Sequence, residues 1–373
     1  MILIKKVVSK KDLADFIDYP HSLFKGDENY VPELHIAQRD LLSPGKHPFH
    51  DHSFVQCFLA CDGNIIKGRV AAILNTNHNK FKNKTDGFFG FFDVENNIET
   101  TRLLLDEVSK WLIEKGATTM IGPVNPSTNE PCGLLVDGFD SPPVAMMTYN
   151  KPYYADLLAS YGLEKKDDLL AYNLPTNTTD KRTLQLKDVL TKRLQLKGIT
   201  IRNINLKDFD TDVQKVLSVY NDAWEANTGF VPMTEKEFKY LAKDLKMILD
   251  KDFCLLAEQN GKIIGFALAV PDVNQVLLKI KRGRLLPFGI FKLLLGIKKI
   301  DYVRVIALGV IDGYRRMGIE ACFYASIIEK AMEKNIKGGE ASWILENNEL
   351  MNNGLLKLNA TAYKRYRIYE KAL

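Results

Sequence analysis

One stretch, residues 303–334, constrains the fold more than any other part of this 373-residue chain. It opens with the apolar run Val-Arg-Val-Ile-Ala-Leu-Gly-Val at 303–310, which has the length of a buried strand. A short loop that contains glycine follows, and then an amphipathic pattern predicts a helix over 318–335. The first backbone N–H groups of a helix have no partner within it, and the helix dipole adds positive potential there. The junction is therefore predicted to hold an anion such as a phosphate.

The loop differs from two widespread phosphate-binding motifs. It is too short for a Walker P-loop and lacks its Gly-Lys-Ser/Thr end, and it lacks the three glycines of a dinucleotide-binding turn. It resembles instead the pyrophosphate loop of the GNAT N-acetyltransferases, Arg/Gln-x-x-Gly-x-Gly/Ala, into which Arg315 and Gly318 fit. Glu320 stands where that family has Gly or Ala, so the loop departs from the pattern at this residue.

Two pairs of similar segments indicate an internal repeat. Residues 57–71 and 254–268 each read as two β-rich runs around a polar turn with glycine, which is a hairpin signature. Residues 111–116 and 331–335 each read as the end of a helix before a new strand. The spacings of the two pairs differ by nearly the length of residues 277–300, so we predict two halves of one architecture with an insertion in the second. A chance match of two hairpins is the alternative.

The polar, turn-rich stretch at 173–180 is the predicted boundary between the halves. We expect a first domain over residues 1–175, a linker over 176–198 and a second domain over 199–373. The elements predicted in the second half are strand 199–203, helices 210–227 and 234–250, hairpin 252–270, strand 302–310, helix 318–335, strand 340–346, a short helix from Asn348 and a closing strand near 361–369. In the first half they are hairpin 54–75, strand 87–93, helix 98–115, strand 118–124, helix 152–161 and strand 168–173.

The order of elements in the second half resembles that of a complete GNAT domain, and the first half resembles the same fold more weakly. This implies the α/β (α+β) fold class, with tandem acyl-CoA N-acyltransferase folds, each a mixed central sheet flanked by helices, as in a two-domain bacterial branch of the superfamily. In the first half, residues 91–99 take the position of the pyrophosphate loop and contain three acidic residues and no glycine. Because a diphosphate would be repelled there, we expect a degenerate domain that does not bind CoA.

The resemblance implies that acetyl-CoA or another acyl-CoA is the co-substrate. The backbone near residues 308–310 would polarise the thioester carbonyl, and the loop would hold the diphosphate. Residues 343–348 resemble the end of a strand that separates from its neighbour in this fold and opens a slot for the pantetheine arm. The residues that the resemblance places at the cofactor are Leu308, Gly309, Val310, Arg315, Arg316, Met317, Gly318, Ile319, Glu320 and Asn348.

Candidates for proton transfer are few. A base for the amine is expected at Glu346, at the end of the separating strand, or at Glu225, at a helix end where the family usually recognises its acceptor. The tyrosine that protonates the leaving thiolate in the family is replaced by Leu355, so Tyr324 and Tyr363 are the nearby candidates for the acid. Each candidate also has an ordinary explanation, because carboxylates often cap helices or face solvent and tyrosines often pack in cores.

The insertion, residues 277–300, has seven basic residues and no acidic one around the apolar run 285–295. One interpretation is a helix packed over the seam between the domains. The other is a lid or channel for a longer acyl chain, whose basic edge would suit an acidic carrier protein or an anionic membrane surface.

Composition narrows the class of protein further. A net charge of +5 is too mild to indicate nucleic acid, and no apolar stretch reaches the roughly 18–20 residues that span a bilayer. The cysteines show no framework spacing and predict reduced thiols, and with an N-terminus unlike a signal peptide they favour the cytoplasm. His47, His50 and His52 form one local cluster without distant ligands, so we expect no metal site.

We therefore expect an acyl-CoA-dependent N-acyltransferase, with N-acetyl transfer favoured, that acts on a small-molecule amine or a peptide. Two alternatives stay open. One is a catalytically silent binding or regulatory protein on the GNAT scaffold, and the other is a long-chain N-acyltransferase that takes its acyl group from an acyl carrier protein. The sequence leaves the acceptor, the acyl length and a homodimeric state open.

Overall fold

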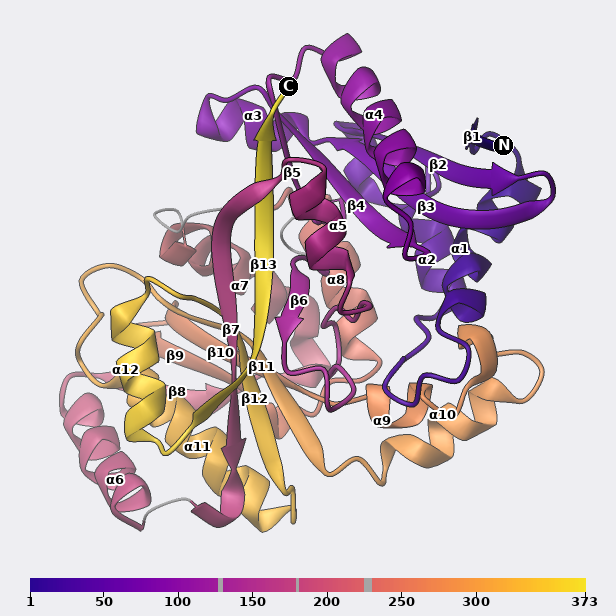
Figure 1. The fold of residues 1–373 in the computed structure, drawn as a ribbon. Coiled ribbons are helices and arrows are strands. Elements are labelled where there is room, and N and C mark those ends of the chain that lie inside the picture. The colour runs from indigo at the N-terminus through magenta and orange to yellow at the C-terminus, as the bar shows by residue number, and fades with distance from the viewer. Residues whose placement is uncertain (127–129, 179–180, 225–229) are drawn as a thin grey trace. The chain divides into compact units, whose positions relative to one another are not determined.

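The computed structural model describes residues 1–126, 130–178, 181–224 and 230–373 (Figure 1). The chain folds into two compact units. Unit 1 comprises Met1–Leu169, Asn274–Leu295 and Lys364–Leu373, and unit 2 comprises Leu170–Val273 and Gly296–Tyr363. No helix among the described residues is both long and apolar enough to cross a membrane.

The sheet of unit 1 begins with three antiparallel pairs, which join β1 to β2, β2 to β3 and β3 to β4. Strand β4 pairs with β5 in parallel, and both β5 and β6 pair with the C-terminal part of β13 in antiparallel fashion. These strands are β1 (Ile2–Lys6), β2 (Phe54–Asp62), β3 (Ile65–Leu74), β4 (Asp86–Val94), β5 (Thr119–Gly122), β6 (Leu134–Asp137) and β13 (Thr361–Ala372).

The helices of unit 1 are α1 (Lys10–Leu23), α2 (His35–Leu41), α3 (Thr76–Lys82), α4 (Ile98–Glu114), α5 (Tyr154–Ser160), α9 (Asn274–Leu277) and the first turns of α10 (Gly289–Ile297). Helix α4 connects the parallel pair β4 and β5. Its apolar residues Leu104, Leu105, Val108 and Leu112 recur at helical spacing and are fully buried in the core of the unit.

Unit 2 repeats this plan. Strands β8, β9, β10 and β11 pair in that order in antiparallel fashion. Strand β11 also pairs with β12 in parallel, and helix α11 connects these two strands in the sequence. The strands are β8 (Ile199–Asn203), β9 (Cys254–Gln259), β10 (Lys262–Pro271), β11 (Tyr302–Val310) and β12 (Gly338–Leu345), followed by the end of β7 (Glu164–Pro175). The helices are α6 (Lys181–Leu196), α7 (Phe209–Trp224), α8 (Glu235–Lys246), α11 (Ile319–Glu333) and α12 (Glu349–Lys357).

The two units therefore share one strand order, β1-β2-β3-β4-β5 in the first and β8-β9-β10-β11-β12 in the second. In each unit a helix links the fourth strand to a parallel fifth strand. The tight turns at Gly63 and at Asn260–Gly261 have positive φ, as short hairpins require. The predicted internal repeat and the predicted fold class are confirmed.

Two parts of the chain differ from what the sequence led us to expect. The expected linker at 176–198 contains helix α6, and Leu194 of this helix is buried in the core of unit 2. The last strand of the first half, β7, ends in unit 2, where its Tyr172 lies in the core. The last strand of the second half, β13, ends in unit 1, where its Tyr369 lies in the core. The expected domain ranges, 1–175 and 199–373, were set by the internal repeat, whereas the compact units have other bounds. The ranges therefore stay a prediction.

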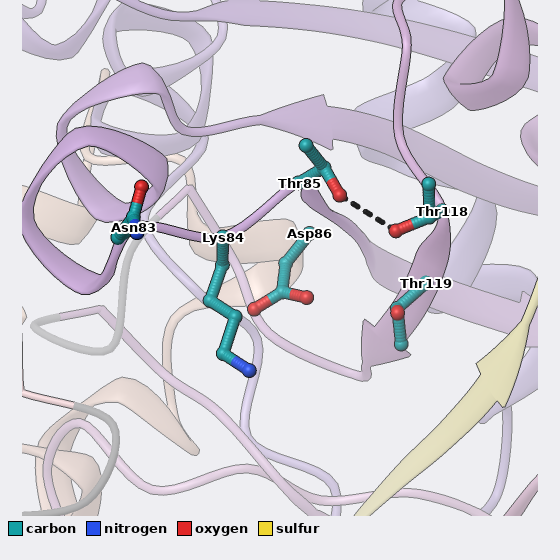
Figure 2. A pocket seen from close by; sticks show the side chains of 6 residues that line it. All are labelled: Asn83, Lys84, Thr85, Asp86, Thr118 and Thr119. Atoms are coloured by element: carbon teal, nitrogen blue, oxygen red, sulfur yellow. Dashed lines mark hydrogen bonds between the residues drawn. The ribbon is translucent and has the colours of Figure 1, made fainter.

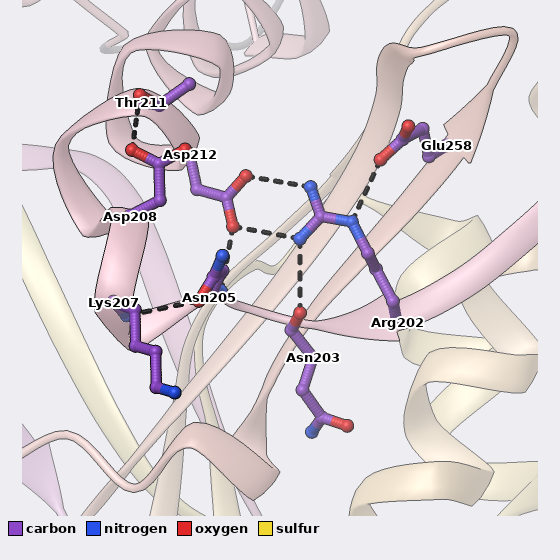
Figure 3. Close-up of polar contacts among 8 residues, drawn as sticks. All are labelled: Arg202, Asn203, Asn205, Lys207, Asp208, Thr211, Asp212 and Glu258. Atoms are coloured by element: carbon purple, nitrogen blue, oxygen red, sulfur yellow. Dashed lines mark hydrogen bonds and ion pairs between the residues drawn. The ribbon is translucent and has the colours of Figure 1, made fainter.

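A partly buried ion pair fixes the start of α7 in unit 2 (Figure 3). Arg202 of β8 donates to both carboxylate oxygens of Asp212, at 2.7 and 2.8 Å, and to Glu258 of β9 at 2.9 Å. The backbone N–H of Asn205 also donates to Asp212, at 2.8 Å. The hydrogen bonds from Arg202 hold the pKa of Asp212 below its usual value, although burial opposes this. One guanidinium thus joins two strands and a helix.

Candidate functional site

The parallel pair of unit 2 opens partway along its length. Strands β11 and β12 are in register from Tyr302↔Gly338 to Val305↔Ala341, and the ladder between them then ends. Strand β11 nevertheless continues to Val310 and β12 to Leu345. The pairing of β11 with β10 also skips Ile306, which marks a β-bulge at the same level. The separation that the sequence predicted for residues 343–348 therefore begins after Val305 and Ala341.

The loop after β11 turns tightly and contains a run of backbone N–H groups without partners in the described structure. The side chains of Ile311, Tyr314 and Met317 pack against the core of unit 2. Gly313, Arg316 and Gly318 have φ of 87°, 62° and 95°, which turns the chain tightly before α11. Tyr314 N–H bonds the carbonyl of Ile311 and Cys322 N–H bonds that of Gly318. Between them, the N–H groups of residues 315–321 make no hydrogen bond with the described part of the chain.

The corresponding helices of the two units begin differently. Helix α11 starts at Gly318, which has no side chain to accept a hydrogen bond from the first turn. Helix α4 starts at Asn97, whose side-chain oxygen accepts from Thr100 N–H at 3.0 Å. Glu95, just before α4, pairs with Lys67 at 3.1 Å. The first turn of α11 is therefore open to an external anion, whereas the first turn of α4 is capped by the chain itself and lies beside a carboxylate.

Arg315, the arginine of the predicted motif, is turned back toward the protein. Its Nε donates to the carbonyl of Val310 at 3.1 Å, and Nη2 donates to the carbonyl of Ala223 at 2.8 Å. Nη1 lies 3.0 Å from a carboxylate oxygen of Asp312. Arg315 thus brings the end of β11, the loop and the last turn of α7 together. Arg316 is exposed and makes no ion pair with the residues that the structure describes.

Glu320 lies in the first turn of α11 and is half-buried. Arg315 pairs with Asp312, so it does not neutralise Glu320. Within the described residues, Glu320 makes no ion pair. Its carboxylate stabilises the positive end of the helix, and it also adds a negative charge close to the open N–H groups.

Helix α6 covers Gly318 and was missed by the sequence analysis. A Cβ at Gly318 would lie 2.9 Å from Cδ2 of Leu190. Lys187 of α6 pairs with Glu329, and the Thr191 hydroxyl lies 3.8 Å from Sγ of Cys322. The signal for α6 was the apolar spacing Leu186, Val189, Leu190 and Leu194, which is helical but sits in a stretch rich in charge.

The other residues that the resemblance placed at the cofactor have varied surroundings. Gly309 and Val310 are buried at the end of β11, and Leu308 packs partly against the core. Ile319 is fully buried. Asn348 caps α12, because its side-chain oxygen accepts from Met351 N–H at 3.2 Å.

The candidates for proton transfer lie in unlike places. Tyr324 on α11 is buried in the core of unit 2, and burial raises the pKa of its hydroxyl well above the usual value. Glu346 is exposed directly after β12. Glu225 lies outside the described residues. Leu355, at the position of the family's usual tyrosine, is buried in the same core as Tyr324.

A buried polar network lies at the point where β11 and β12 separate. Arg304 Nε donates to Ser342 Oγ at 2.9 Å, and the Ser342 hydroxyl donates to Glu340 Oε1 at 2.5 Å. The Tyr363 hydroxyl donates to Oε2 of Glu340. The Glu340 side chain is fully buried. Sequence analysis named Tyr363 but missed Arg304, Glu340 and Ser342. The available signal was a charged residue inside each of two otherwise apolar strands.

Trp343, the next residue on β12, adds an open donor to this region. The Arg304 guanidinium lies 4.7 Å from the centre of the Trp343 ring. The indole Nε1 is buried and has no hydrogen-bond partner in the described structure. A buried unpaired donor is costly, so this position favours a bound polar atom.

Unit 1 carries a shallow polar depression of another kind (Figure 2). It is lined by Asn83, Lys84, Thr85, Asp86, Thr118 and Thr119, at the beginnings of β4 and β5. Thr85 and Thr118 bond each other at 2.6 Å, and Asp86 bonds His78 at 2.9 Å. Thr85, Thr118 and Asp86 thus use their side chains in hydrogen bonds of the fold itself.

The fold and the open loop define a tandem GNAT-fold protein. A tandem GNAT protein from the clavulanic acid biosynthesis pathway aligns over 100% of this chain and 98% of its own, with a TM-score of 0.58 and 10% identity. A GCN5-related N-acetyltransferase from Sphaerobacter thermophilus aligns over 100% and 95%, with a TM-score of 0.55 and 11% identity. At these identities the likeness concerns the fold.

Two relatives are similar in sequence along nearly their whole length. Protein YghO from Escherichia coli is 35% identical over 100% of this chain and 95% of its own, and the bacterial ceramide synthase of Caulobacter vibrioides is 34% identical over 98% and 96%. No family model matches the chain. The protein belongs to the family that contains YghO and this bacterial ceramide synthase.

Proposed function

We propose that this protein is an N-acyltransferase that uses an acyl-CoA donor. The observation that carries the proposal is the run of open N–H groups at residues 315–321, which lies directly after the strand that separates from β12. A helix start with free donors is suited to the diphosphate of CoA, and separated strands are suited to its extended arm. The family relationship and the GNAT fold support an acyltransferase.

The residues present fit a diphosphate in most respects. Gly318 allows the tight turn before α11, with Leu190 of α6 packed where a Cβ would lie, and Arg316 is an exposed cation without an ion pair in the described structure. Arg315 stabilises the shape of the loop through Val310 and Ala223, so its contribution is to position the backbone donors. Glu320 opposes binding, and we therefore propose modest rather than tight affinity for CoA.

Bound acyl-CoA supplies a thioester whose C–S bond breaks as the amine nitrogen forms a C–N bond, so one proton must leave nitrogen and one must reach sulfur. Glu346 is the exposed carboxylate next to the separated strand, and we keep it as the proposed base. Glu225 stays a proposal. The deep burial of Tyr324 makes it a poor proton donor to a thiolate. We therefore propose Tyr363, whose hydroxyl donates to Glu340, as the other candidate for the acid.

The name of the ceramide synthase relative supports a proposal for the chemical class of the acceptor. A ceramide is a fatty acid joined by an amide bond to a long-chain amino alcohol, which is the product of an N-acylation. We propose that the acceptor here is likewise a long-chain amine and that the acyl group is longer than acetyl. A carrier-protein donor remains the alternative source of such a chain.

A second candidate is a silent binding protein on the same scaffold, which Glu320 and Leu355 favour because both depart from the family pattern. One experiment separates the two. The purified protein is incubated with sphinganine and with acetyl-CoA or palmitoyl-CoA, and free thiol and amide product are measured by a thiol reagent and mass spectrometry. We expect thiol release and amide formation with palmitoyl-CoA.

Matched variants make this test specific. Glu346→Gln should lower kcat by about 100-fold if it removes a general base, while Glu349→Gln, an exposed carboxylate in the first turn of α12, should leave kcat unchanged. Binding of an acyl-CoA without turnover of any amine would favour the silent binding protein. Absence of both binding and turnover would overturn the proposal.

A further inference from the structure

Unit 1 carries a group of large apolar side chains that face solvent. They lie on α10 and the segment before it, which Figure 1 shows in orange. We call this group the α10 patch, and it consists of Leu286, Phe288, Phe291, Leu294 and Leu295, with exposed fractions of 79%, 72%, 61%, 59% and 73%. Five large, exposed apolar side chains within ten residues are more than the scattered single ones usual on a protein surface, and they point to an interaction site.

The segment is held firmly, so its exposure is a property of the folded unit. Arg284 pairs with Asp18 of α1 at 2.7 Å. A Cβ at Gly283 would lie 1.7 Å from the carbonyl oxygen of Glu33, and one at Gly289 would lie 2.4 Å from that of Arg284. The first approach sets the segment against Glu33, and the second folds the segment tightly on itself. The opposite side of α10, with Ile290 and Leu293, is only partly exposed, so the patch is the outward face of an anchored helix.

Exposed basic side chains flank the patch along the chain and one lies within it. Lys279, Lys281, Arg282 and Lys292 are all exposed, and none of them makes an ion pair with the described residues. The stretch 277–300 contains no acidic residue. Lys292 lies on the helix itself, between Phe291 and Leu293, and donates to the carbonyl of Lys279 at 3.0 Å. An apolar face with a basic border is the pattern of a segment that lies in the interface of an anionic membrane.

We propose that the α10 patch docks unit 1 onto an anionic lipid surface, with the Phe and Leu side chains among the acyl chains and the basic residues at the headgroups. A second copy of this chain fits less well, because a self-complementary contact would set Lys292 and its neighbours against the same cations. An acidic protein also fits less well. Protein interfaces are depleted in Lys, and Leu is under-represented among the residues that carry their binding energy, whereas this segment combines Leu with Lys. The inference does not depend on the proposed acyl transfer.

Co-sedimentation with lipid vesicles tests this directly. The full chain is mixed with vesicles of phosphatidylcholine alone and with vesicles of equal parts phosphatidylcholine and phosphatidylglycerol. We expect binding to the anionic vesicles that is at least about tenfold stronger and that weakens with salt. Equal binding to both vesicle types, or none to the anionic ones, would overturn the proposal.

Variants locate the binding surface. Phe288→Ser with Phe291→Ser should weaken binding to anionic vesicles about tenfold or more, and so should Lys279→Glu with Lys281→Glu. Leu350→Ser with Leu356→Ser is the matched control, because these leucines of α12 are 74% and 55% exposed but lie outside the patch. Circular dichroism and the thermal midpoint confirm that each variant is folded. Binding that survives both patch variants would refute the assignment.

A fluorescent reporter distinguishes insertion from loose attachment. Addition of phosphatidylglycerol vesicles should shift the tryptophan emission of Phe291→Trp to the blue. The shift should exceed that of the native protein, whose three tryptophans give the background signal. If the patch serves an acidic carrier protein or a second copy instead, the shift appears with that carrier or with rising protein concentration and is absent with vesicles. Either of these results would replace the membrane with another partner.

Discussion

The Arg315 guanidinium donates a 2.8 Å hydrogen bond to the carbonyl oxygen of Ala223, in the last turn of α7. The last carbonyls of a helix lack intrahelical partners and carry partial negative charge, so a cation is favoured there. Because the same side chain also bonds Val310, Arg315 links the end of β11 to the end of a helix far away in sequence. The arginine of the motif therefore acts on the shape of the loop.

Arg315→Ala is expected to destabilise the protein by about 1–3 kcal/mol, since carbonyl oxygens lose a charged donor. It should also weaken acyl-CoA binding, because the open N–H groups lose their fixed arrangement. Arg315→Lys keeps the charge but cannot bond two carbonyls in the planar geometry of guanidinium, so it should recover little of the loss. Urea unfolding and calorimetry measure the two effects. Full acyl-CoA affinity in Arg315→Ala would contradict the positioning role.

Gly318→Ala should be more harmful than Gly313→Ala. Both residues have positive φ, 95° and 87°, so an alanine at either position costs about 1–2 kcal/mol of backbone strain. Only Gly318 faces a neighbour, because its Cβ would lie 2.9 Å from Leu190, whereas nothing lies within 4 Å of a Cβ at Gly313. Urea unfolding of both variants separates the two effects, because Gly313→Ala reports backbone strain alone and Gly318→Ala reports strain plus the clash with Leu190. In a double-mutant cycle, Leu190→Ala should relieve part of the cost of Gly318→Ala and none of the cost of Gly313→Ala.

Glu320→Gln is expected to tighten acyl-CoA binding. Removing one negative charge from the first turn of α11 should be worth about 0.3–1 kcal/mol, or about a two- to fivefold change in Kd. The same change should lower the stability of the ligand-free protein slightly, because the helix dipole loses a favourable partner. Calorimetry at low ionic strength gives both values. Weaker binding in Glu320→Gln would mean that the carboxylate contacts the ligand in a favourable way.

Much of the fold could be predicted because strands and helices leave local patterns. The hairpins, β11, α11 and α12 all lie close to their expected ranges, since apolar periodicity and glycine turns are local signals. The partners of β7 and β13 could not be predicted, because alternation fixes which face of a strand is buried but not which strand lies beside it. Helix α6 was missed because its charged residues resemble those of a linker.

The candidate site could be predicted only in part, for a similar reason. Backbone donors follow from a strand, a glycine loop and a helix start, and all three are visible in the sequence. The network of Arg304, Glu340 and Ser342 joins residues distant in sequence and becomes visible only when β11 and β12 are paired. The contact of Leu190 with Gly318 likewise depends on how α6 packs.

Asp168 of unit 1 should make stability depend on pH in acid. Burial alone would raise the pKa of this carboxyl, but hydrogen bonds from Arg367, Arg365 and Lys165 more than offset that effect and hold the pKa at about 2, below the ordinary 3.8. A folded-state pKa below the unfolded one contributes stability above about pH 4, and this contribution is lost as the pH falls toward 2. Asp168→Asn should therefore be less stable at neutral pH, and the difference from wild type should shrink in acid. Urea midpoints across this range check it, and a constant difference would contradict it.

Glu340→Ala should be among the most destabilising single substitutions in unit 2. Arg304 is 2% exposed and its guanidinium would lose the carboxylate 3.8 Å away, while Ser342 would lose its acceptor. An uncompensated buried charge costs about 3–5 kcal/mol. Glu333→Ala, which breaks the exposed pair with Lys330 on the same unit, should change the stability little, because water screens this pair. Tyr363→Phe removes only one hydrogen bond to Glu340 and should cost about 0.5–1.5 kcal/mol. Urea unfolding of the three variants gives this order if the network is buried and paired, and equal losses for Glu340→Ala and Glu333→Ala would show that Glu340 is open to water.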